Sequence, residues 1–443
     1  MKSLIKKFIP SFLINWYHFS LAFLGAIFYR FPSQKLTIIG ITGTNGKSTV
    51  VELTAKILER AGYKTASLSS INFKIGEKEW PNTLKMTMPG RLKLQRFLRQ
   101  AAAEGCQYVV LEVTSEGISQ HRHKFIDFDV AVFTNLTPEH IEAHGSFKNY
   151  RAAKGKLFQA TKEIHVINLD DENVEYFLKF DANEKYVYTM NNEQKTKNNN
   201  SYKKLLTVHC SLFTSGPSGV SFEVQNTKFN LKLLGEFNGY NALAAICVGV
   251  SQGIDLEICK KALEKVEGIP GRMEIVISGP FKVFIDYAFT PAALEKVYQT
   301  LKPKGARMIC VLGACGGGRD KWKRPVLGEI AAKYCNQIII TNEDPYNEDP
   351  NQILSQIKSG IFKSPGCLKA DSPEGCFPIT NFYEILDRRE AIRESLKLAG
   401  SNDVVIITGK GCEPWICVER GKKIPWDDRE VVKEEFRKLK DKK

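Results

Sequence analysis

The chain has 443 residues, 43% hydrophobic and 25% charged, which is the composition of a folded globular protein and excludes wholesale disorder and fibrous architectures. Lysine and arginine number 63 against 49 acidic residues, and the formal net charge of +14 favours acidic partners without choosing among them. The 11 cysteines lack the spacing of a disulfide scaffold or a zinc site. No basic-aromatic module of the usual kinds is found, so we expect no nucleic-acid partner.

The N-terminal segment 8–31 is an apolar, aromatic run that follows three lysines. Its aromatic residues recur at helical spacing and form one stripe, which consists of Phe8, Phe12, Trp16, Phe19 and Phe23. Such a helix can lie in the surface of an anionic membrane, pack on the protein's own core or span the bilayer. We favour contact between residues 1–31 and the inner face of the membrane, and the other two readings stay open.

From Lys35 onward, short β-branched runs alternate with helical segments, which predicts an α/β fold with a mostly parallel sheet. The first series comprises strands at 36–41, 108–113, 130–136 and 164–169, with a helix from about Lys47. Two glycines around a proline at 267–272 mark an interdomain joint. A second series follows, with strands at 283–288, 307–313, 337–343 and 403–409.

We therefore predict an aromatic amphipathic segment at 1–34, a central P-loop ATPase domain at 35–271 and a Rossmann-like α/β domain at 272–443. The polar, low-complexity stretch 191–204 is interpreted as a solvated loop, and no function is assigned to it.

Residues 40–49 read GITGTNGKST between a predicted strand and a predicted helix, which is the setting of a phosphate-binding loop. Gly43 and Gly46 let backbone N–H groups converge on phosphates, Lys47 supplies positive charge, and the Ser48 hydroxyl can ligate Mg²⁺. The strict GxxxxGK[ST] pattern fails, because Ile41 stands where its first glycine belongs. The setting nevertheless predicts nucleotide binding.

Three polar residues follow later elements of the same series. Glu112 ends a predicted strand, where its carboxylate can face the loop phosphates, His140 follows the next strand, and Lys154 lies on the helix after it. Taken singly, each has an ordinary reading: a solvated carboxylate, a loop histidine and a surface lysine.

Nine motifs stand in one order across 35–443, among them GTNGKS, EVTSEG, GIPGRMEIV, GGGRDKWKRP and GKGCE. This order resembles the Mur ligase family, and most closely its members that extend UDP-N-acetylmuramoyl-dipeptides to tripeptides in peptidoglycan synthesis. The resemblance implies an ATP-dependent amide ligase that uses Mg²⁺. ATP would phosphorylate the acceptor carboxylate, and the amine of an amino acid would then displace the phosphate.

The resemblance also implies roles for single residues. Ser48 and Glu112 would bind the Mg²⁺ on the ATP phosphates, His140 would bind a second Mg²⁺, and Lys154 would be carbamylated beside that ion. The further ATP contacts would be Gly43, Thr44, Asn45, Gly46, Lys47, Thr49, Asn241, Arg272 and Asp286. The muramoyl peptide would be contacted by Thr87, Ser115, Gln120 and Arg122. The pocket for the incoming amino acid would comprise Arg319, Glu343, Asp344, Tyr346, Gly409 and Glu413.

Four positions depart from the family pattern. Glu116, Phe289 and Cys412 each replace a histidine, and Tyr346 replaces an arginine. That arginine would clamp the distal carboxylate of diaminopimelate bidentately, which a phenol cannot do, so diaminopimelate, lysine and other diamino acids stay open.

Only 34 residues precede Lys35, where the family normally carries a UDP-binding domain. We expect that the UDP is held by the other two domains, that another protein supplies the missing domain, or that the acceptor is lipid-linked. The aromatic stripe favours the last.

Two other functions are weighed against this one. A folylpolyglutamate- or cyanophycin-type ligase would share the phosphate loop and the carbamylated lysine. A non-catalytic, membrane-associated nucleotide-binding regulator would tolerate the four altered positions. The retained Lys47, Glu112, His140 and Lys154 favour an enzyme, which we expect to be cytoplasmic.

Overall fold

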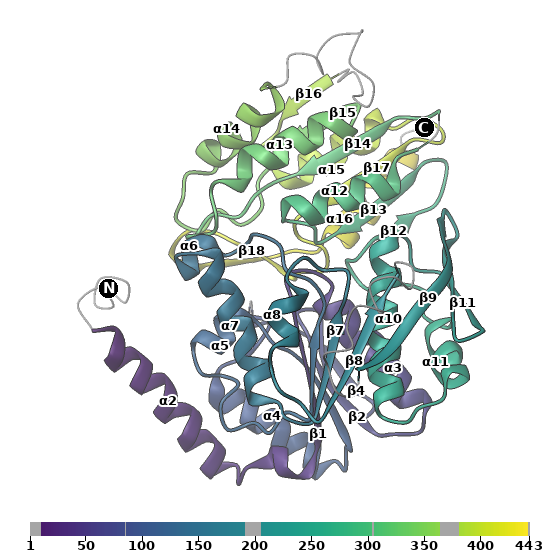
Figure 1. The fold of residues 1–443 in the computed structure, drawn as a ribbon. Coiled ribbons are helices and arrows are strands. Elements are labelled where there is room, and N and C mark those ends of the chain that lie inside the picture. The colour runs from purple at the N-terminus through teal and green to yellow at the C-terminus, as the bar shows by residue number, and fades with distance from the viewer. Residues whose placement is uncertain (1–9, 85, 191–204, 304, 364–380, 442–443) are drawn as a thin grey trace. The chain divides into compact units, whose positions relative to one another are not determined.

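The computed structural model describes residues 10–84, 86–190, 205–303, 305–363 and 381–441, which fold as two compact units (Figure 1). Unit 1 contains the chain up to Pro138 together with Ser146–Glu267, and unit 2 contains Glu139–Gly145 and Gly268–Lys443. Both are layered α/β structures, so the predicted fold class is confirmed. Phe8 of the aromatic stripe and the predicted loop 191–204 lie outside the described residues.

Unit 1 is built on an eleven-stranded sheet in the order β11-β10-β9-β8-β7-β6-β1-β5-β2-β3-β4. Its centre is parallel, and the pairs at both edges are antiparallel. The four predicted strands are β1 (Thr37–Thr42), β5 (Tyr108–Glu112), β6 (Val130–Phe133) and β7 (Ile164–Asn168). The others are β2 (Thr65–Leu68), β3 (Asn72–Ile75), β4 (Lys78–Pro81), β8 (Glu184–Thr189), β9 (Leu205–Gly216), β10 (Gly219–Val224) and β11 (Thr227–Leu231).

Helices cover both faces of this sheet, because the central strands are apolar on both sides. Ile38, Val109 and Ala131 point to the core under one group of helices: α4 (Arg91–Ala103), α5 (Ser115–Ser119), α7 (Phe147–Ala160) and α8 (Val174–Leu178). The alternate residues, such as Ile39 and Val110, point to the opposite face. That face carries α3 (Lys47–Arg60), α10 (Glu236–Ser251) and α11 (Leu256–Leu263).

The N-terminal helix α2 (Ser11–Phe28) packs along α4 by one side only. Ala22 and Ala26 are buried there, and the rings of Phe19 and Phe23 lie 5.1 and 5.2 Å from that of Phe125. The rest of its apolar surface is exposed: Phe12, Leu13, Trp16, Tyr17, Leu24, Ile27 and Phe28. Among the helices of the described ranges, none has the length and apolar character needed to cross a membrane.

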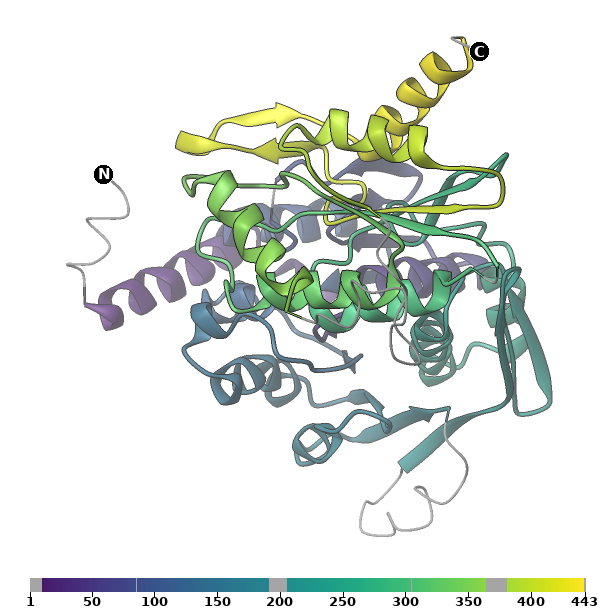
Figure 2. The same ribbon diagram turned by 90° about the horizontal axis from the view of Figure 1, so that it is seen from above.

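Unit 2 contains a six-stranded sheet in the order β12-β13-β17-β14-β15-β16, parallel except for β12. Its strands are β12 (Glu274–Ile277), β13 (Lys282–Asp286), β14 (Met308–Leu312), β15 (Gln337–Ile340), β16 (Asn381–Glu384) and β17 (Val404–Thr408). Figure 2 shows this sheet between helices α15 (Arg388–Leu398) and α16 (Asp428–Lys440) on one face and helices α12 (Pro291–Leu301), α13 (Lys323–Tyr334) and α14 (Pro350–Ile361) on the other. A small hairpin, β18 (Trp415–Cys417) and β19 (Lys423–Pro425), follows the last central strand.

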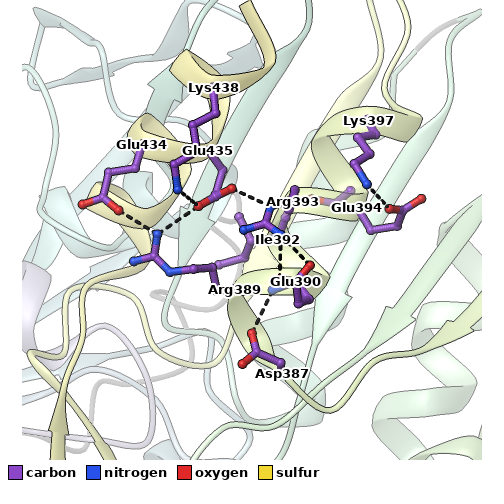
Figure 3. A network of polar contacts seen from close by, with 11 residues as sticks. Asp387, Arg389, Glu390, Ile392, Arg393, Glu394, Lys397, Glu434, Glu435 and Lys438 are labelled. Atoms are coloured by element: carbon purple, nitrogen blue, oxygen red, sulfur yellow. Dashed lines mark hydrogen bonds and ion pairs between the residues drawn. The ribbon is translucent and has the colours of Figure 1, made fainter. Parts of the chain in front are cut away.

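An ion-pair network joins α15 to α16 in unit 2 (Figure 3). The Glu435 carboxylate accepts hydrogen bonds from Arg393 Nε (2.6 Å), Arg389 Nη1 (2.9 Å) and Lys438 Nζ (2.8 Å), although its side chain is inaccessible to solvent. These three cations lower the pKa of Glu435 from 4.5 to about 2, with Arg393 contributing most.

We expect Glu435→Gln to lower the free energy of unfolding by about 1 kcal/mol at pH 7, a value discounted because the partner cations are partly exposed. Because the folded-state pKa of Glu435 is depressed, its contribution is present above about 4.5 and is lost as the pH falls towards about 2. The urea-unfolding curves of wild type and variant should therefore converge over that pH range. Glu434→Gln, at the more exposed neighbouring carboxylate, is the control and should change little at any pH.

Candidate active site

The loop between β1 and α3, residues 43–46, is held in shape by the chain that follows β6. The backbone N–H of Thr44 donates to the Asn135 carbonyl (2.8 Å), and that of Asn45 donates to the Asn135 side-chain oxygen (3.0 Å). The Thr134 hydroxyl donates to the Asn45 carbonyl (2.8 Å). The end of a neighbouring parallel strand therefore fixes the loop at the carboxyl edge of the sheet, where α/β proteins bind their ligands.

Glycine is required at two positions of this loop. A Cβ atom on Gly43 would lie 1.9 Å from the Thr134 hydroxyl, and one on Gly46 would lie 2.2 Å from Oδ1 of Asn241. Gly46 also has φ +84° and directly precedes α3, whose first backbone N–H groups have no partner within the helix. Asn241 of α10, the residue assigned to ATP by resemblance, therefore contacts the loop from the adjacent helix.

Glu112 at the end of β5 lies at the start of α3 and is only 3% exposed. Its Oε2 accepts hydrogen bonds from the Ser48 hydroxyl (2.7 Å) and from the Ser70 backbone N–H (2.9 Å). The Lys47 ammonium lies 3.7 Å from its Oε1 and donates to a loop carbonyl. Thr49 is buried in the first turn of the helix. The structure thus brings together Lys47, Ser48 and Glu112, as the phosphate-loop prediction requires.

Lys154 projects from α7 into the same loop. Its Nζ donates to the Gly43 carbonyl (2.6 Å) and lies 4.6 Å from the centre of the Tyr150 ring, and the residue is only 2% exposed. Burial, together with the nearby Lys47 charge, lowers the pKa of Lys154 well below its usual value of 10.5, and Glu112 opposes this shift only in part. A buried lysine with a depressed pKa is a neutral amine for more of the time, and therefore a nucleophile.

The Ser48 hydroxyl and the Glu112 carboxylate are hard oxygen donors of the kind that Mg²⁺ prefers. Among the described residues, no group of three histidine, cysteine, aspartate or glutamate side chains is arranged to hold a metal. In nucleotide sites, Mg²⁺ is usually bound by one or two protein oxygen ligands together with substrate phosphates.

The four residues assigned to the muramoyl peptide all belong to unit 1, and Thr87, Gln120 and Arg122 lie at one segment before α4. Arg122 donates to the Gln120 side chain (2.8 Å) and to the Met88 carbonyl, next to Thr87 in the chain. Ser115 is buried at the start of α5. Burial lowers the pKa of Arg122, and the charge of Glu116, one of the departures from the family, opposes that shift. The carboxylate of Glu116 thus lies near the guanidinium of Arg122, where the family has a histidine.

His140 belongs to unit 2, unlike the phosphate loop. It has the left-handed backbone conformation (φ +58°) and immediately precedes the short helix α6 (Ile141–His144), whose first two N–H groups donate to Asp320 (3.2 and 2.9 Å). On its other side, Glu139 forms a buried ion pair with Lys323 (2.8 Å). The Lys323 ammonium also lies 4.8 Å from the centre of the ring of Phe289, another departure from the family. Contacts on both sides thus fix the backbone of His140.

Arg272 and Asp286, assigned to ATP by resemblance, stand at the start of unit 2. The Arg272 guanidinium lies 4.3 Å from the centre of the Tyr287 ring, and the Tyr287 hydroxyl donates to Glu413 (3.0 Å). Asp286 is buried and accepts two backbone N–H bonds (2.7 and 2.6 Å). Burial raises its pKa, and the Arg272 charge opposes the shift.

The residues assigned to the incoming amino acid surround a buried ion pair that the sequence did not reveal. Lys410 is inaccessible to solvent and its Nζ lies 3.0 Å from Asp344 and 2.6 Å from Glu413. Glu343 accepts a weak bond from the Cys315 thiol (3.2 Å), and burial together with Asp344 raises its pKa. Its second oxygen, Oε2, is buried and lacks a hydrogen-bond partner within the described part of the chain.

The other predicted residues of this pocket lie around that centre. A Cβ atom on Gly409, which has φ +104°, would lie 2.4 Å from Oε2 of Glu343, so the close approach of the loop to this carboxylate requires a glycine. Tyr346 also has a positive φ and donates its N–H to the Cys417 carbonyl (3.1 Å). Burial raises the pKa values of Glu139 and Cys315, and the charge of the nearby Arg319 opposes both shifts. Burial raises the pKa of Cys412, which does not favour a nucleophilic thiolate.

Arg388 and Asp428 form a second buried pair that sequence analysis missed. The guanidinium donates to both carboxylate oxygens (2.9 and 2.7 Å), and each side chain is at most 1% exposed. Arg388 also donates to the carbonyls of Asn342 (3.2 Å) and Thr408 (2.9 Å), which directly precede Glu343 and Gly409. This pair therefore holds the two loops that carry the predicted amino-acid pocket.

The chain is similar to known proteins over most of its length. Residues 41–249 match the Mur ligase middle domain, and residues 271–411 match the Mur ligase glutamate ligase domain. The chain is 38% identical over 428 residues to a UDP-N-acetylmuramoyl-L-alanyl-D-glutamate–2,6-diaminopimelate ligase of Syntrophomonas wolfei, covering 94% of this chain and 82% of the relative. It is 35% identical over 448 residues to a UDP-N-acetylmuramyl-tripeptide synthetase of Roseiflexus, covering 95% and 82%.

Among solved structures, one of a UDP-N-acetylmuramoyl-L-alanyl-D-glutamate–2,6-diaminopimelate ligase superimposes with a TM-score of 0.57 at 30% identity. The match covers 91% of this chain and 79% of that structure. Both domain matches and the long, specific sequence similarity lead to one conclusion: the chain belongs to the Mur ligase family.

Proposed function

We propose that this protein is an ATP-dependent ligase that joins an amino acid to a UDP-N-acetylmuramoyl-dipeptide in the synthesis of a peptidoglycan precursor. The observation that carries the proposal is the group of Lys47, Ser48, Glu112 and Lys154 around the phosphate loop, in a chain whose curated relatives are named as such ligases.

The reaction has two balanced steps. A carboxylate oxygen of the acceptor attacks the γ-phosphorus of ATP, the bond to the β-phosphate oxygen breaks, and ADP leaves. The amine of the amino acid then attacks the acyl carbon, the C–O bond to phosphate breaks, and the nitrogen loses a proton. Backbone N–H groups at the start of α3 and the Lys47 ammonium stabilise the charge on the phosphates.

Ser48 and Glu112 are the residues we expect to hold Mg²⁺, and His140 is the one we expect to hold a second ion. Bound Mg²⁺ would neutralise charge that develops on the phosphoryl oxygens. Lys154 is expected to act as a carbamate: its neutral amine attacks the carbon of CO₂, a C–N bond forms as one C=O π bond opens, and the nitrogen loses one proton, which leaves an anion where the protonated lysine would be a cation. Its burial and depressed pKa support this step, because a fully protonated ammonium has no lone pair to offer.

The amino acid is expected to be a diamino acid. Asp344 is already paired with Lys410, whereas Glu343 keeps one buried carboxylate oxygen without a partner in the described chain, which suits an ammonium group of the substrate. Tyr346 stands where related ligases carry an arginine, so lysine and ornithine belong beside diaminopimelate in any test.

The test is phosphate release by purified protein with Mg²⁺-ATP, UDP-N-acetylmuramoyl-L-Ala-D-Glu and each of these three amines. Release that requires both the acceptor and one amine is the expected result. A separate arm offers a folate and glutamate. Release only in that arm would identify a folylpolyglutamate-type ligase, and release in no arm would contradict the proposed acceptor.

We also propose that α2 lies in the surface of an anionic membrane. Phe12 and Trp16 are 68% and 69% exposed, Ser11–Phe28 contains no lysine, arginine, aspartate or glutamate, and the sequence before it carries Lys2, Lys6 and Lys7. An apolar helix face with a basic flank favours the interface between acyl chains and anionic headgroups.

Replacing both Phe12 and Trp16 by serine is expected to weaken co-sedimentation with phosphatidylglycerol vesicles at least about 10-fold, since each ring contributes about 1.5 to 3 kcal/mol when buried. Phe362→Ser, at an exposed ring of unit 2, is the control. Equal partition of wild type and double variant would contradict the membrane proposal and leave the ligase proposal untouched.

A further inference from the structure

Unit 1 contains a cavity away from the phosphate loop. It has a volume of about 210 Å³ and lies between the hairpin β3–β4, at the edge of the sheet, and helix α4. Its walls are of two kinds: the aromatic rings of Phe73, Trp80 and Phe97, and the long polar side chains of Lys93, Arg96 and Gln100.

The aromatic wall is partly pre-formed. Phe73 and Trp80 are directly opposite each other on β3 and β4, with ring centres 6.0 Å apart, and Phe73 also meets Phe97 of α4 at 5.9 Å. Phe73 and Phe97 are buried, but Trp80 remains 39% exposed. A large aromatic side chain exposed beside a cavity offers a flat surface on which a planar ring can stack.

The polar wall carries uncompensated positive charge. Lys93 and Arg96 are one turn apart on the exposed side of α4, and neither has an ion-pair or hydrogen-bond partner among the residues that the structure describes. Most other cations at this edge of unit 1 are paired, as Lys74 is with Glu59 and Lys78 with Glu104. Two free cations beside an aromatic wall fit a ligand that is both planar and anionic.

The cavity adjoins the segment that we expect to contact the acceptor peptide. Thr83, Leu84 and Pro89 line it, Thr87 lies between them in the chain, and Arg122 donates to the carbonyl of Met88. A volume of about 210 Å³ is smaller than pockets that enclose a whole drug-sized ligand, so it suits one end of a larger molecule.

We propose that this cavity binds the uridine diphosphate end of the acceptor, with the base on Trp80 and the diphosphate at Lys93 and Arg96. The identity of the nucleotide rests on the proposed function, since the acceptor expected there is a UDP-linked peptide. The planar and anionic character of the ligand rests on the cavity itself.

The test is calorimetric titration of the full chain with UDP, in the presence of a saturating non-hydrolysable ATP analogue that blocks the phosphate loop. Trp80→Ala and Arg96→Gln are each expected to weaken UDP binding at least about 10-fold. Arg99→Gln, at an arginine of α4 that does not line the cavity, should leave the affinity within about 2-fold. Unchanged affinity in both cavity variants, or no binding of UDP by wild type, would overturn the proposal.

Binding of uridine and of pyrophosphate, the two parts of the ligand, tests the aromatic wall and the polar wall of the cavity separately. Uridine should lose affinity only in Trp80→Ala, and pyrophosphate only in Arg96→Gln. In the phosphate-release assay, the same variants should raise KM for the UDP-linked acceptor and leave KM for ATP unchanged. If both variants release phosphate with the wild-type KM for the acceptor, the cavity site is refuted and the ligase proposal stands. If the wild type binds UDP in the cavity but releases no phosphate with any amine, the ligase proposal is refuted and the cavity site stands.

Discussion

Replacing Lys154 by alanine is expected to reduce acceptor-dependent phosphate release by about 100- to 1,000-fold, the loss typical of removing one electrostatic contact to a transition state. The reason lies in its surroundings. Lys154 is buried against the Gly43 carbonyl in the phosphate loop, and the same burial that depresses its pKa favours reaction of its amine with CO₂. The measurement is kcat by phosphate release, together with a melting curve to verify folding.

Three comparisons distinguish a carbamate from a merely structural lysine. Short carboxylic acids such as acetate should partly restore Lys154→Ala, because they supply the missing anion. Lys154→Arg keeps the positive charge but cannot form the carbamate, so it should be as inactive as the alanine variant. Lys156→Ala, at an exposed lysine two residues later on α7, should retain activity. Full activity of Lys154→Ala in buffer free of CO₂ would rule out the carbamate.

The fold was largely predictable because its central strands are short apolar runs. Strands buried on both faces are mostly apolar, so β1, β5, β6 and β7 stand out, as do β13, β14, β15 and β17 of unit 2. The strands β2, β8, β9, β12 and β16 were not predicted, and neither were the antiparallel edge strands β3, β4, β10 and β11. The four edge strands are short and contain polar residues, and their partners are set by hairpin geometry rather than by hydrophobicity.

The site was predictable where a single segment carries it. Gly43 to Ser48 form one loop, whose setting between a strand and a helix is visible in the sequence. Contacts between distant segments were not visible. Asn135 lies about 90 residues from the loop that it holds, and the pairing of Glu139 with Lys323 spans 184 residues.

For the same reason, we could not predict from the sequence that the segment containing His140 folds with unit 2. Asp320 and Lys323, which hold that segment, lie in the motif GGGRDKWKRP, where only Arg319 was assigned a role. Lys410 could have been found, because it stands inside GKGCE between two residues that were assigned to the amino-acid pocket.

Removing one partner of the pair between Arg388 and Asp428 is expected to have the largest effect on stability. Asp428→Asn leaves a guanidinium in the interior without its counter-charge, which typically costs about 3 to 5 kcal/mol of unfolding free energy. Asp428 also accepts the indole N–H of Trp426 (2.7 Å), so its loss disturbs the start of α16 as well. Urea unfolding at pH 7 measures the change, and a loss below about 1 kcal/mol would contradict the prediction.

A double variant distinguishes the contribution of the Arg388–Asp428 pair to stability from its role in positioning the amino-acid pocket. Arg388→Met with Asp428→Leu removes both charges, and such apolar replacements of buried pairs are often neutral in stability. It also removes the hydrogen bonds from Arg388 to the carbonyls of Asn342 and Thr408, which hold the loops of the amino-acid pocket. We therefore expect the double variant to regain most of the unfolding free energy and still to show a raised KM for the amine with an unchanged KM for ATP. If its KM for the amine equals that of wild type, the pair stabilises unit 2 without positioning the pocket.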